Sequence, residues 1–231
     1  MSPEQIPHSH DNIRLGVLLS GRGSNFAAIQ QAIENRQLNQ AEVVVVISNR
    51  ADAAGLAWAK SRGLNTVALE KDGFENRNAF DQVLTETLQA YGVELVILAG
   101  YDRILGAAVL SAYSGRILNI HPSLLPAYGG KGMVGHKVHQ AVLENGETES
   151  GCTVHLVTEL IDGGTILGQT RISVQPDDTI ESLAARVLAE EHRLYPRMIG
   201  KFIRQAFPHR LTTKNKGSSH EPETLSDKSL A

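Results

Sequence analysis

The chain has 231 residues, of which 42% are hydrophobic and 20% are charged, a balance typical of one globular domain. Its 22 Lys and Arg residues against 25 Asp and Glu residues give a net charge of −3, which argues against a polyanion binder that relies on bulk charge. The single cysteine, Cys152, excludes an internal disulfide and a cysteine-clustered metal site. No apolar run is long enough for a transmembrane helix, and residues 1–12 lack the apolar core of a signal peptide. We therefore expect a cytoplasmic protein.

Short apolar runs alternate with helical patterns over the first half of the chain. The runs predict strands at residues 13–20, 42–48, 66–69, 95–99 and 116–120. Apolar residues at helical spacing predict intervening helices at residues 26–33, 53–62, 77–91 and 106–113. This alternation indicates a Rossmann-like α/β fold with a doubly wound, mostly parallel sheet. In such sheets, ligands bind beyond the carboxyl ends of the strands.

The pattern changes after residue 121. Residues 122–135 contain two prolines and four glycines, which predicts a long loop of the kind that usually has a function. A helix is expected at residues 135–145, and a long helix from Asp178 or Thr179 to Ala206. Between them, strands at residues 151–158 and 165–174 are joined too tightly for a crossover helix. We therefore expect the C-terminal portion of the sheet to be antiparallel.

These elements predict the domain organisation. Residues 1–12 are expected to form a flexible N-terminal extension, and residues 209–231, which are polar and without a period, a disordered tail. Between them we expect one domain at residues 13–208, made of a Rossmann-like half at 13–121 and a second half at 122–208.

A glycine turn follows the first predicted strand. Gly21 and Gly23 begin a dinucleotide-type motif, but Phe26 occupies the position of its third glycine, and the P-loop lysine is also absent. Free amides at the start of the next helix suit a phosphate monoester, with Ser24 and Asn25 adding hydrogen bonds. The alternative is a simple tight turn in which Ser24 or Asn25 caps the helix.

Polar residues also lie at the ends of two later strands. Asn119 and His121 alternate in a strand, so their side chains point to the same side, as an amide and an imidazole that stabilise an oxyanion and supply a proton would. Asp162 precedes two glycines after another strand, and a carboxylate near His121 would favour the protonated imidazole. The alternatives are a neutral core histidine and a simple turn aspartate.

Two further histidines are candidates for a metal site. His136 and His139 are spaced three residues apart on a predicted helix, but no pattern for a third ligand lies nearby. We therefore predict a solvated or capping role for both.

Six segments occur in a characteristic order, at residues 20–25 (SGRGSN), 48–53 (SNRADA), 98–105 (LAGYDRIL), 119–126 (NIHPSLLP), 151–155 (GCTVH) and 162–164 (DGG). Together they resemble the phosphoribosylglycinamide formyltransferase family of the folate-dependent formyltransferases. The resemblance covers roughly residues 13–207. It implies the formyltransferase fold, with a phosphate-binding first half and a folate-binding and catalytic second half.

The resemblance also implies a reaction. A formyl group passes from 10-formyltetrahydrofolate, the co-substrate, to the amino group of N1-(5-phospho-D-ribosyl)glycinamide in de novo purine biosynthesis, without a metal. The implied partners are these small molecules, with no nucleic acid and no membrane, in a monomer or homodimer.

Site residues follow from the same resemblance. It implies that Asn119 and protonated His121 hold the oxyanion, that His121 donates the proton, and that Asp162 keeps His121 protonated. The implied ribonucleotide site consists of Gly23, Ser24 and Asn25 for the phosphate, with Glu191 as a contact to the glycinamide substrate. The implied folate contacts are Arg77, Asp102, Arg103, Ile104, Leu105 and Asn119.

This sequence departs from the family at two places. Asp102 stands where the family often has methionine, which removes apolar packing against the pterin. The loop at residues 127–135 is longer and richer in glycine than in some relatives, as expected for a lid.

Three alternative functions share this fold. Formyltetrahydrofolate deformylases use the same three catalytic residues with water, but they usually carry an extra N-terminal domain, whereas about a dozen residues precede the first strand here. Methionyl-tRNA formyltransferases usually add a C-terminal domain that binds tRNA. A non-catalytic nucleotide or folate binder would not need Asn119, His121 and Asp162 together.

Overall fold

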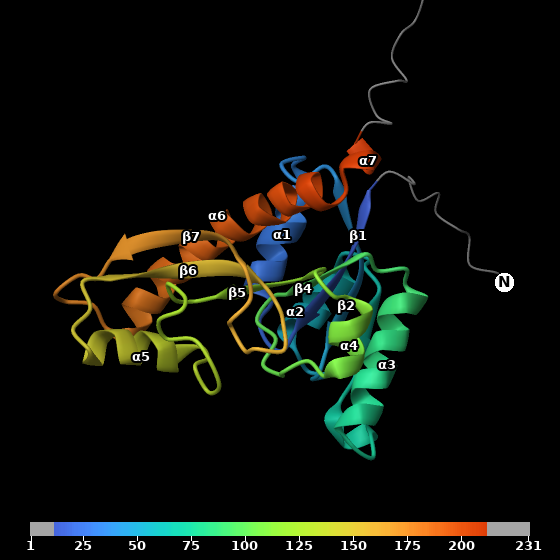
Figure 1. The fold of residues 1–231 in the computed structure, drawn as a ribbon, viewed down its shortest axis with the longest axis horizontal. Helices are drawn as coiled ribbons and strands as arrows, with labels where there is room; N and C mark the ends of the chain where they lie inside the picture. Colours follow the sequence, from blue (N-terminus) through green and yellow to red (C-terminus); the bar gives the residue numbers. More distant parts are fainter. Residues whose placement is uncertain (1–11, 212–231) are drawn as a thin grey trace, which may run out of the picture.

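The computed structural model describes residues 12–211, whose strands form one mixed sheet (Figure 1). In spatial order the strands are β3 (Thr66–Ala68), β2 (Ala41–Ser48), β1 (Ile13–Leu19), β4 (Leu95–Leu98), β5 (Ile117–His121), β6 (Glu149–Leu156) and β7 (Ile166–Ser173). The pairs from β3 to β5 are parallel, whereas β5–β6 and β6–β7 are antiparallel. The predicted doubly wound sheet with an antiparallel C-terminal portion is confirmed.

Helices connect the strands and cover both faces of the sheet. They are α1 (Ser24–Glu34), α2 (Ala54–Ser61), a 3₁₀ turn η1 (Lys71–Gly73), α3 (Arg77–Ala90), α4 (Ala107–Ala112), α5 (His136–Glu144), α6 (Ile180–Ala206) and α7 (Pro208–Leu211). α6 begins where predicted because Thr179 and Ser182 form a capping box, in which the Thr179 side chain accepts from the Ser182 amide.

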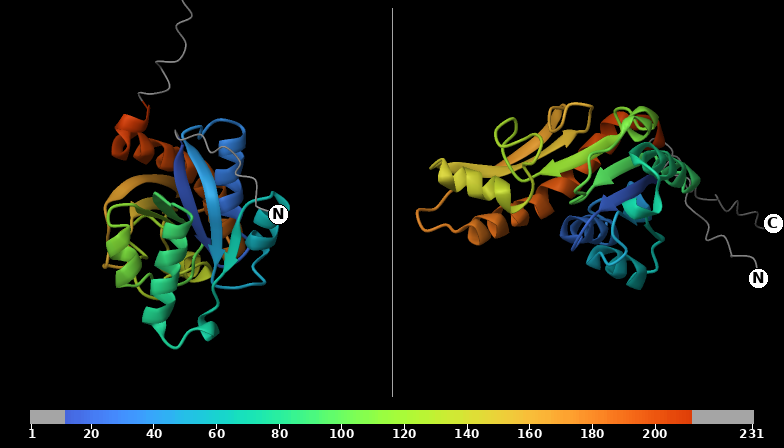
Figure 2. Two further views of the ribbon diagram at one scale, coloured as in Figure 1. Left: turned by 90° about the vertical axis from the view of Figure 1, so that its right-hand side faces the viewer. Right: turned by 90° about the horizontal axis from the view of Figure 1, so that it is seen from below.

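The core has two layers, one on each side of the sheet. On one face α1, α2, α5 and α6 bury side chains such as Phe26 and Tyr195 against the strands. On the other face α3 and α4 bury Phe80, Leu84 and Val109. Figure 2 shows α5 and the β6–β7 hairpin extending away from the N-terminal elements, with α6 passing along both parts.

The strand order creates the place where ligands bind in such sheets. β1 lies between β2 and β4, so the chain winds outward in one direction from β1 to β3 and in the other from β4 onward. The segments that follow β1 and β4 therefore flank the switch point of the sheet. β4 is buried along its whole length, as expected for a parallel strand covered on both faces.

The C-terminal boundary is a correction to the predicted tail. Instead of leaving the fold at residue 209, the chain forms α7, in which Arg210 is ion-paired with Glu94, 2.6 Å away, at the start of β4. This pairing is a long-range contact, which the local composition did not reveal. The predicted N-terminal extension up to residue 11 and the tail from residue 212 lie outside the described residues. Within residues 12–211 no helix is both long and apolar enough to cross a membrane.

Candidate active site

The glycine loop, residues 21–25, joins β1 to α1. Gly23 is the N-cap of α1 and has φ 73°, a left-handed conformation that strains other residues. A Cβ atom at Gly23 would lie 2.9 Å from the Cα atom of Gly55 in α2, which is closer than real contacts allow. No side chain caps the helix, so the alternative in which Ser24 or Asn25 is the N-cap is excluded. The first amides of α1 are therefore not capped by a side chain.

Asn25 and Glu191 join the glycine loop to α6. Asn25 donates from Nδ2 to Glu191 Oε2 over 2.6 Å, although the residues are 166 positions apart. Burial raises the pKa of Glu191 to about 7, and the hydrogen bond from Asn25 opposes this rise. Asn25 Oδ1 is buried and has no partner within the described residues. The predicted ribonucleotide residues are thus gathered on one wall.

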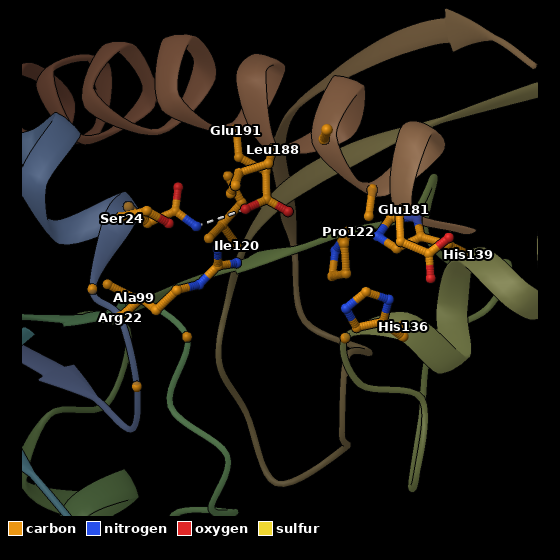
Figure 3. Close-up of a pocket in the computed structure, with 17 residues that line it drawn as sticks. Arg22, Ser24, Ala99, Ile120, Pro122, His136, His139, Glu181, Leu188 and Glu191 are labelled. Atoms are coloured by element: carbon orange, nitrogen blue, oxygen red, sulfur yellow. Dashed lines mark hydrogen bonds between the residues drawn. The ribbon is translucent and has the colours of Figure 1, made fainter. Parts of the chain in front are cut away.

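A cavity of about 500 Å³ opens beside this wall (Figure 3). Its lining includes the whole glycine loop, together with Gly100, Ile120 and Pro122 from the ends of β4 and β5. Arg22 reaches from the loop towards Ile120 in Figure 3. The sequence did not predict the opposite wall, which consists of α5 and the first half of α6 and contributes His136, His139, Glu181, Ala184, Ala185 and Leu188.

Asn119 and His121 lie on neighbouring positions of one face of β5, as predicted. The antiparallel register places Asn119 opposite His155 of β6, and Asn119 Nδ2 lies 3.1 Å from His155 Nε2. His121 is 4% exposed and lies opposite Thr153.

Asp162 completes a group that we call the histidine cluster: Asn119, His121, His155 and Asp162. One carboxylate oxygen of Asp162 lies 3.6 Å from His121 Nδ1, and the other lies 3.6 Å from His155 Nε2. Asp162 adopts φ 55°, which aspartate tolerates better than most residues, and Gly130 donates its amide to Asp162 Oδ2 over 2.9 Å. The structure thus brings together Asn119, His121 and Asp162.

His155 is the member of this cluster that sequence reasoning missed as a functional candidate. Its Nδ1 lies 2.9 Å from the Leu156 carbonyl, which can only accept, so Nδ1 carries a proton. Burial lowers the pKa of His155, and the imidazole is neutral at neutral pH. Nε2 therefore accepts a hydrogen bond from Asn119, which fixes the orientation of that amide.

The loop after β5 contacts His121 directly. His121 Nε2 donates to the Tyr128 carbonyl over 2.8 Å. The Tyr128 hydroxyl donates to Glu147 over 2.7 Å and accepts from Asn145, which anchors the loop to the end of α5. The loop at residues 122–135 thus holds the ring through one carbonyl and Asp162 through one amide.

The predicted folate residues, residues 102–105 and Arg77, are also neighbours. Arg77, the first residue of α3, donates to the carbonyls of Ile104 and Leu105. The Arg103 guanidinium lies over the Phe80 ring, 4.3 Å from its centroid. Leu105 is buried in the core, whereas Ile104 is 48% exposed. Asp102 and Ile104 are therefore the exposed side chains of this segment.

The expectation of a solvated or capping role is wrong for His139. His139 is 4% exposed, and its Nδ1 has no partner within residues 12–211. Burial lowers the pKa of His139 to about 4, so the ring is neutral. The same described residues contain no group of three His, Cys, Asp or Glu side chains that could hold a metal ion.

Comparisons with known proteins identify relatives of this chain. The formyl transferase family model covers residues 13–199. The Escherichia coli phosphoribosylglycinamide formyltransferase is 42% identical over 186 residues, which are 80% of this chain and 85% of that protein. The chloroplastic enzyme of the same name from Arabidopsis thaliana is 42% identical over 84% of this chain and 66% of its own length. The crystal structure of glycinamide ribonucleotide transformylase 1 from Symbiobacterium toebii superposes with a TM-score of 0.80 at 44% identity, covering 89% of this chain and 94% of that one.

The chain therefore belongs to the formyl transferase family. Within it, the relatives place the chain among the phosphoribosylglycinamide formyltransferases, the glycinamide ribonucleotide transformylases of de novo purine biosynthesis. The resemblance drawn from the six sequence segments is confirmed.

Proposed function

We propose that this chain transfers the formyl group of 10-formyltetrahydrofolate to the amino group of N1-(5-phospho-D-ribosyl)glycinamide. The observation that carries the proposal is the convergence of Asn119, His121 and Asp162 at the end of β5, with the glycine loop on the cavity wall nearby. Family membership supports a folate as the formyl donor.

The reaction needs one bond to form and one to break. The neutral amine of the glycinamide attacks the formyl carbon, and a tetrahedral intermediate with an oxyanion forms. The bond from this carbon to N10 of the folate then breaks. The amine gives up one proton, and N10 gains one, so the products are the N-formyl compound and tetrahydrofolate. The site must therefore stabilise an oxyanion and move a proton.

The histidine cluster supplies groups for both tasks. The Asn119 amide uses one N–H for His155, which leaves the second N–H for the oxyanion. Asp162 lies within ion-pair distance of His121 Nδ1 and is the proposed partner of that ring when it donates a proton. Proton delivery from His121 Nε2 requires the Tyr128 carbonyl to release its hydrogen bond, which makes the loop at residues 122–135 part of the catalytic step.

The glycine loop is the proposed phosphate site. The uncapped first amides of α1 and the positive end of its dipole suit a phosphate monoester, and Gly23, Ser24 and Asn25 provide them. Glu191 lies beside Asn25 on the same wall and is the proposed contact to the ribonucleotide. Arg77, Asp102, Arg103, Ile104, Leu105 and Asn119 are the proposed folate residues. Arg77 acts through its hydrogen bonds to the Ile104 and Leu105 carbonyls, and Asp102 contacts the folate through its backbone.

The remaining expectations are part of the proposal. The chemistry uses side chains and backbone amides and needs no metal. The partners are the two small-molecule substrates, without nucleic acid or membrane. A monomer or homodimer and a cytoplasmic location remain predictions.

One assay tests the proposal and separates it from hydrolysis. Purified protein receives 10-formyltetrahydrofolate with and without the glycinamide ribonucleotide, and the release of tetrahydrofolate is followed. We expect release only when both substrates are present, and its loss in the variant His121→Asn. Release without the ribonucleotide would identify a deformylase, and no release under either condition would overturn the proposed reaction.

A further inference from the structure

Three polar side chains meet at the switch point of the sheet, one after each of three neighbouring strands. Ser20 follows β1, Asn49 follows β2, and Asp102 lies four residues beyond the end of β4. Ser20 Oγ lies 2.5 Å from Asn49 Oδ1, and Asn49 Nδ2 lies 2.9 Å from Asp102 Oδ1. The backbone amide of Asp102 lies 2.9 Å from Ser20 Oγ, so the three residues form a closed ring of hydrogen bonds. We call these three residues the switch-point ring.

The short contact between Ser20 and Asn49 indicates which of these groups donates. Two oxygens 2.5 Å apart need a proton between them, and an amide oxygen has none, so the Ser20 hydroxyl donates to Asn49 Oδ1. The Asn49 amide then donates to Asp102, and the Asp102 amide donates to Ser20. The Ser20 hydroxyl has a second acceptor within reach, Asp102 Oδ1 at 2.9 Å, and each of the three residues both donates and accepts a hydrogen bond.

Arg50 adds a charge to the outer side of the ring. Its guanidinium is ion-paired with Asp102 Oδ2, the oxygen that the ring does not use. The side chains of Arg50 and Asp102 are 57% and 39% exposed, so solvent screens this pair, whereas Ser20 is 5% exposed. The hydrogen bonds of the ring therefore contribute more to its rigidity than the ion pair does.

The ring joins the two segments that the proposed function assigns to different substrates. Ser20 immediately precedes the glycine loop, and Asp102 is the first residue of the 102–105 segment. A backbone hydrogen bond from the Ser20 amide to the Gly100 carbonyl, 3.0 Å long, adds to this link. The Asp102 side chain points into the ring, so its oxygens are already engaged by protein groups.

We propose that Asp102 is a positioning residue that, through the ring with Ser20 and Asn49, holds the glycine loop and the 102–105 segment in fixed relative positions for both substrates. This inference rests on the proposed function of the two segments. A site whose parts are held in place before binding loses less conformational freedom when the ligand arrives. Opening the ring at either end should therefore weaken the binding of both substrates, including the substrate whose site does not adjoin the altered residue.

The test uses two variants that open the ring from opposite sides. Ser20→Ala removes the hydroxyl next to the glycine loop, and Asp102→Ala removes the carboxylate of the other segment. Dissociation constants for the glycinamide ribonucleotide and for a non-reactive folate analogue are measured by calorimetry, with turnover alongside. We expect each variant to raise the dissociation constants of both ligands about fivefold, the factor that one net hydrogen bond supplies. Asp52→Ala, which removes an exposed carboxylate from the turn after β2, is the matched control and should change neither constant.

A conservative variant separates the ring from the ion pair. Asp102→Asn keeps an oxygen for the Asn49 amide and loses the charge opposite Arg50, so it should bind both ligands nearly as the parent does. If Asp102→Ala weakened only the folate analogue, Asp102 would be a direct folate contact, and the proposal would be wrong. Unchanged affinities for both ligands in the two ring-opening variants would also overturn it. A parent protein without turnover would refute the proposed function, while the binding constants would still report on the ring.

Discussion

The glycine loop and the histidine cluster differ in how they are held in place. The loop depends on backbone geometry within five consecutive residues and on the close approach of Gly23 to Gly55. The cluster depends on side chains from β5, β6 and the turn at Asp162, which come together only when distant segments pair. Damage to the loop should therefore appear in substrate binding, and damage to the cluster should appear in turnover.

The largest effect is expected in the histidine cluster. His121→Asn and Asp162→Asn should each lower turnover about 100-fold or more, the scale of a lost general acid. Dissociation constants for both substrates should change much less, because the lost interaction strengthens in the transition state. Steady-state kinetics and calorimetry on the same preparations check this. A loss that appeared mainly in the dissociation constants would assign the cluster to binding.

Gly23→Val should produce the opposite pattern. The substitution places a branched side chain at φ 73° and against Gly55, so the loop must distort. We expect ribonucleotide affinity to fall about tenfold or more and affinity for a folate analogue to change far less. Gly73→Ala is the control, since Gly73 lies outside the cavity lining and a Cβ atom there meets nothing within 4 Å. Equal losses for both ligands would mean that the loop is only structural.

Variants of His155 separate its contribution to turnover from that of His121. His155→Phe removes the acceptor for the Asn119 amide, so turnover should fall about tenfold, less than for His121→Asn. His155→Gln retains an oxygen that accepts a hydrogen bond and should recover part of that loss. The check is turnover at saturating substrate. Identical turnover in the two variants would remove the orienting role of His155.

Glu191, on the cavity wall, should make the free energy of unfolding depend on pH. Burial raises its pKa from 4.5 to about 7, so between these values the folded protein keeps a proton that the unfolded chain releases. This group therefore lowers the free energy of unfolding as pH rises from about 4.5 to about 7. Glu191→Gln cannot lose a proton, so its stability should fall less than that of the parent between pH 5 and pH 8. Urea unfolding at both pH values is the measurement, and parallel changes in the two proteins would contradict the assignment.

The smallest effect concerns the end of the described chain. Arg210→Ala breaks the ion pair with Glu94, whose two side chains are 43% and 22% exposed. Such surface pairs contribute about 1 kcal/mol or less, so the melting temperature should fall by a few degrees at most. Turnover should remain unchanged, because the pair lies at the start of β4 rather than at its carboxyl end. An altered turnover would show that α7 influences the site.

The sequence predicted what depends on local patterns. Apolar runs predicted the strands, and the glycine turn and the polar ends of β5 and β6 marked the site. His155 was missed as a functional candidate because its partner, Asn119, becomes visible only through the antiparallel register of β5 and β6. The cavity wall formed by α5 and the first half of α6, the Tyr128 carbonyl and the switch-point ring were missed because they also depend on contacts between distant segments. Contacts between residues 82 positions apart, as between Ser20 and Asp102, leave no periodic signal.

The most direct test of the account is a double-mutant cycle on turnover with His121→Asn, Asp162→Asn and the combined variant. If Asp162 acts through His121, its removal matters only while the imidazole is present. The combined variant should then turn over within about threefold of His121→Asn alone. Losses that multiply would show that the two residues act independently and would contradict the proposed catalytic arrangement.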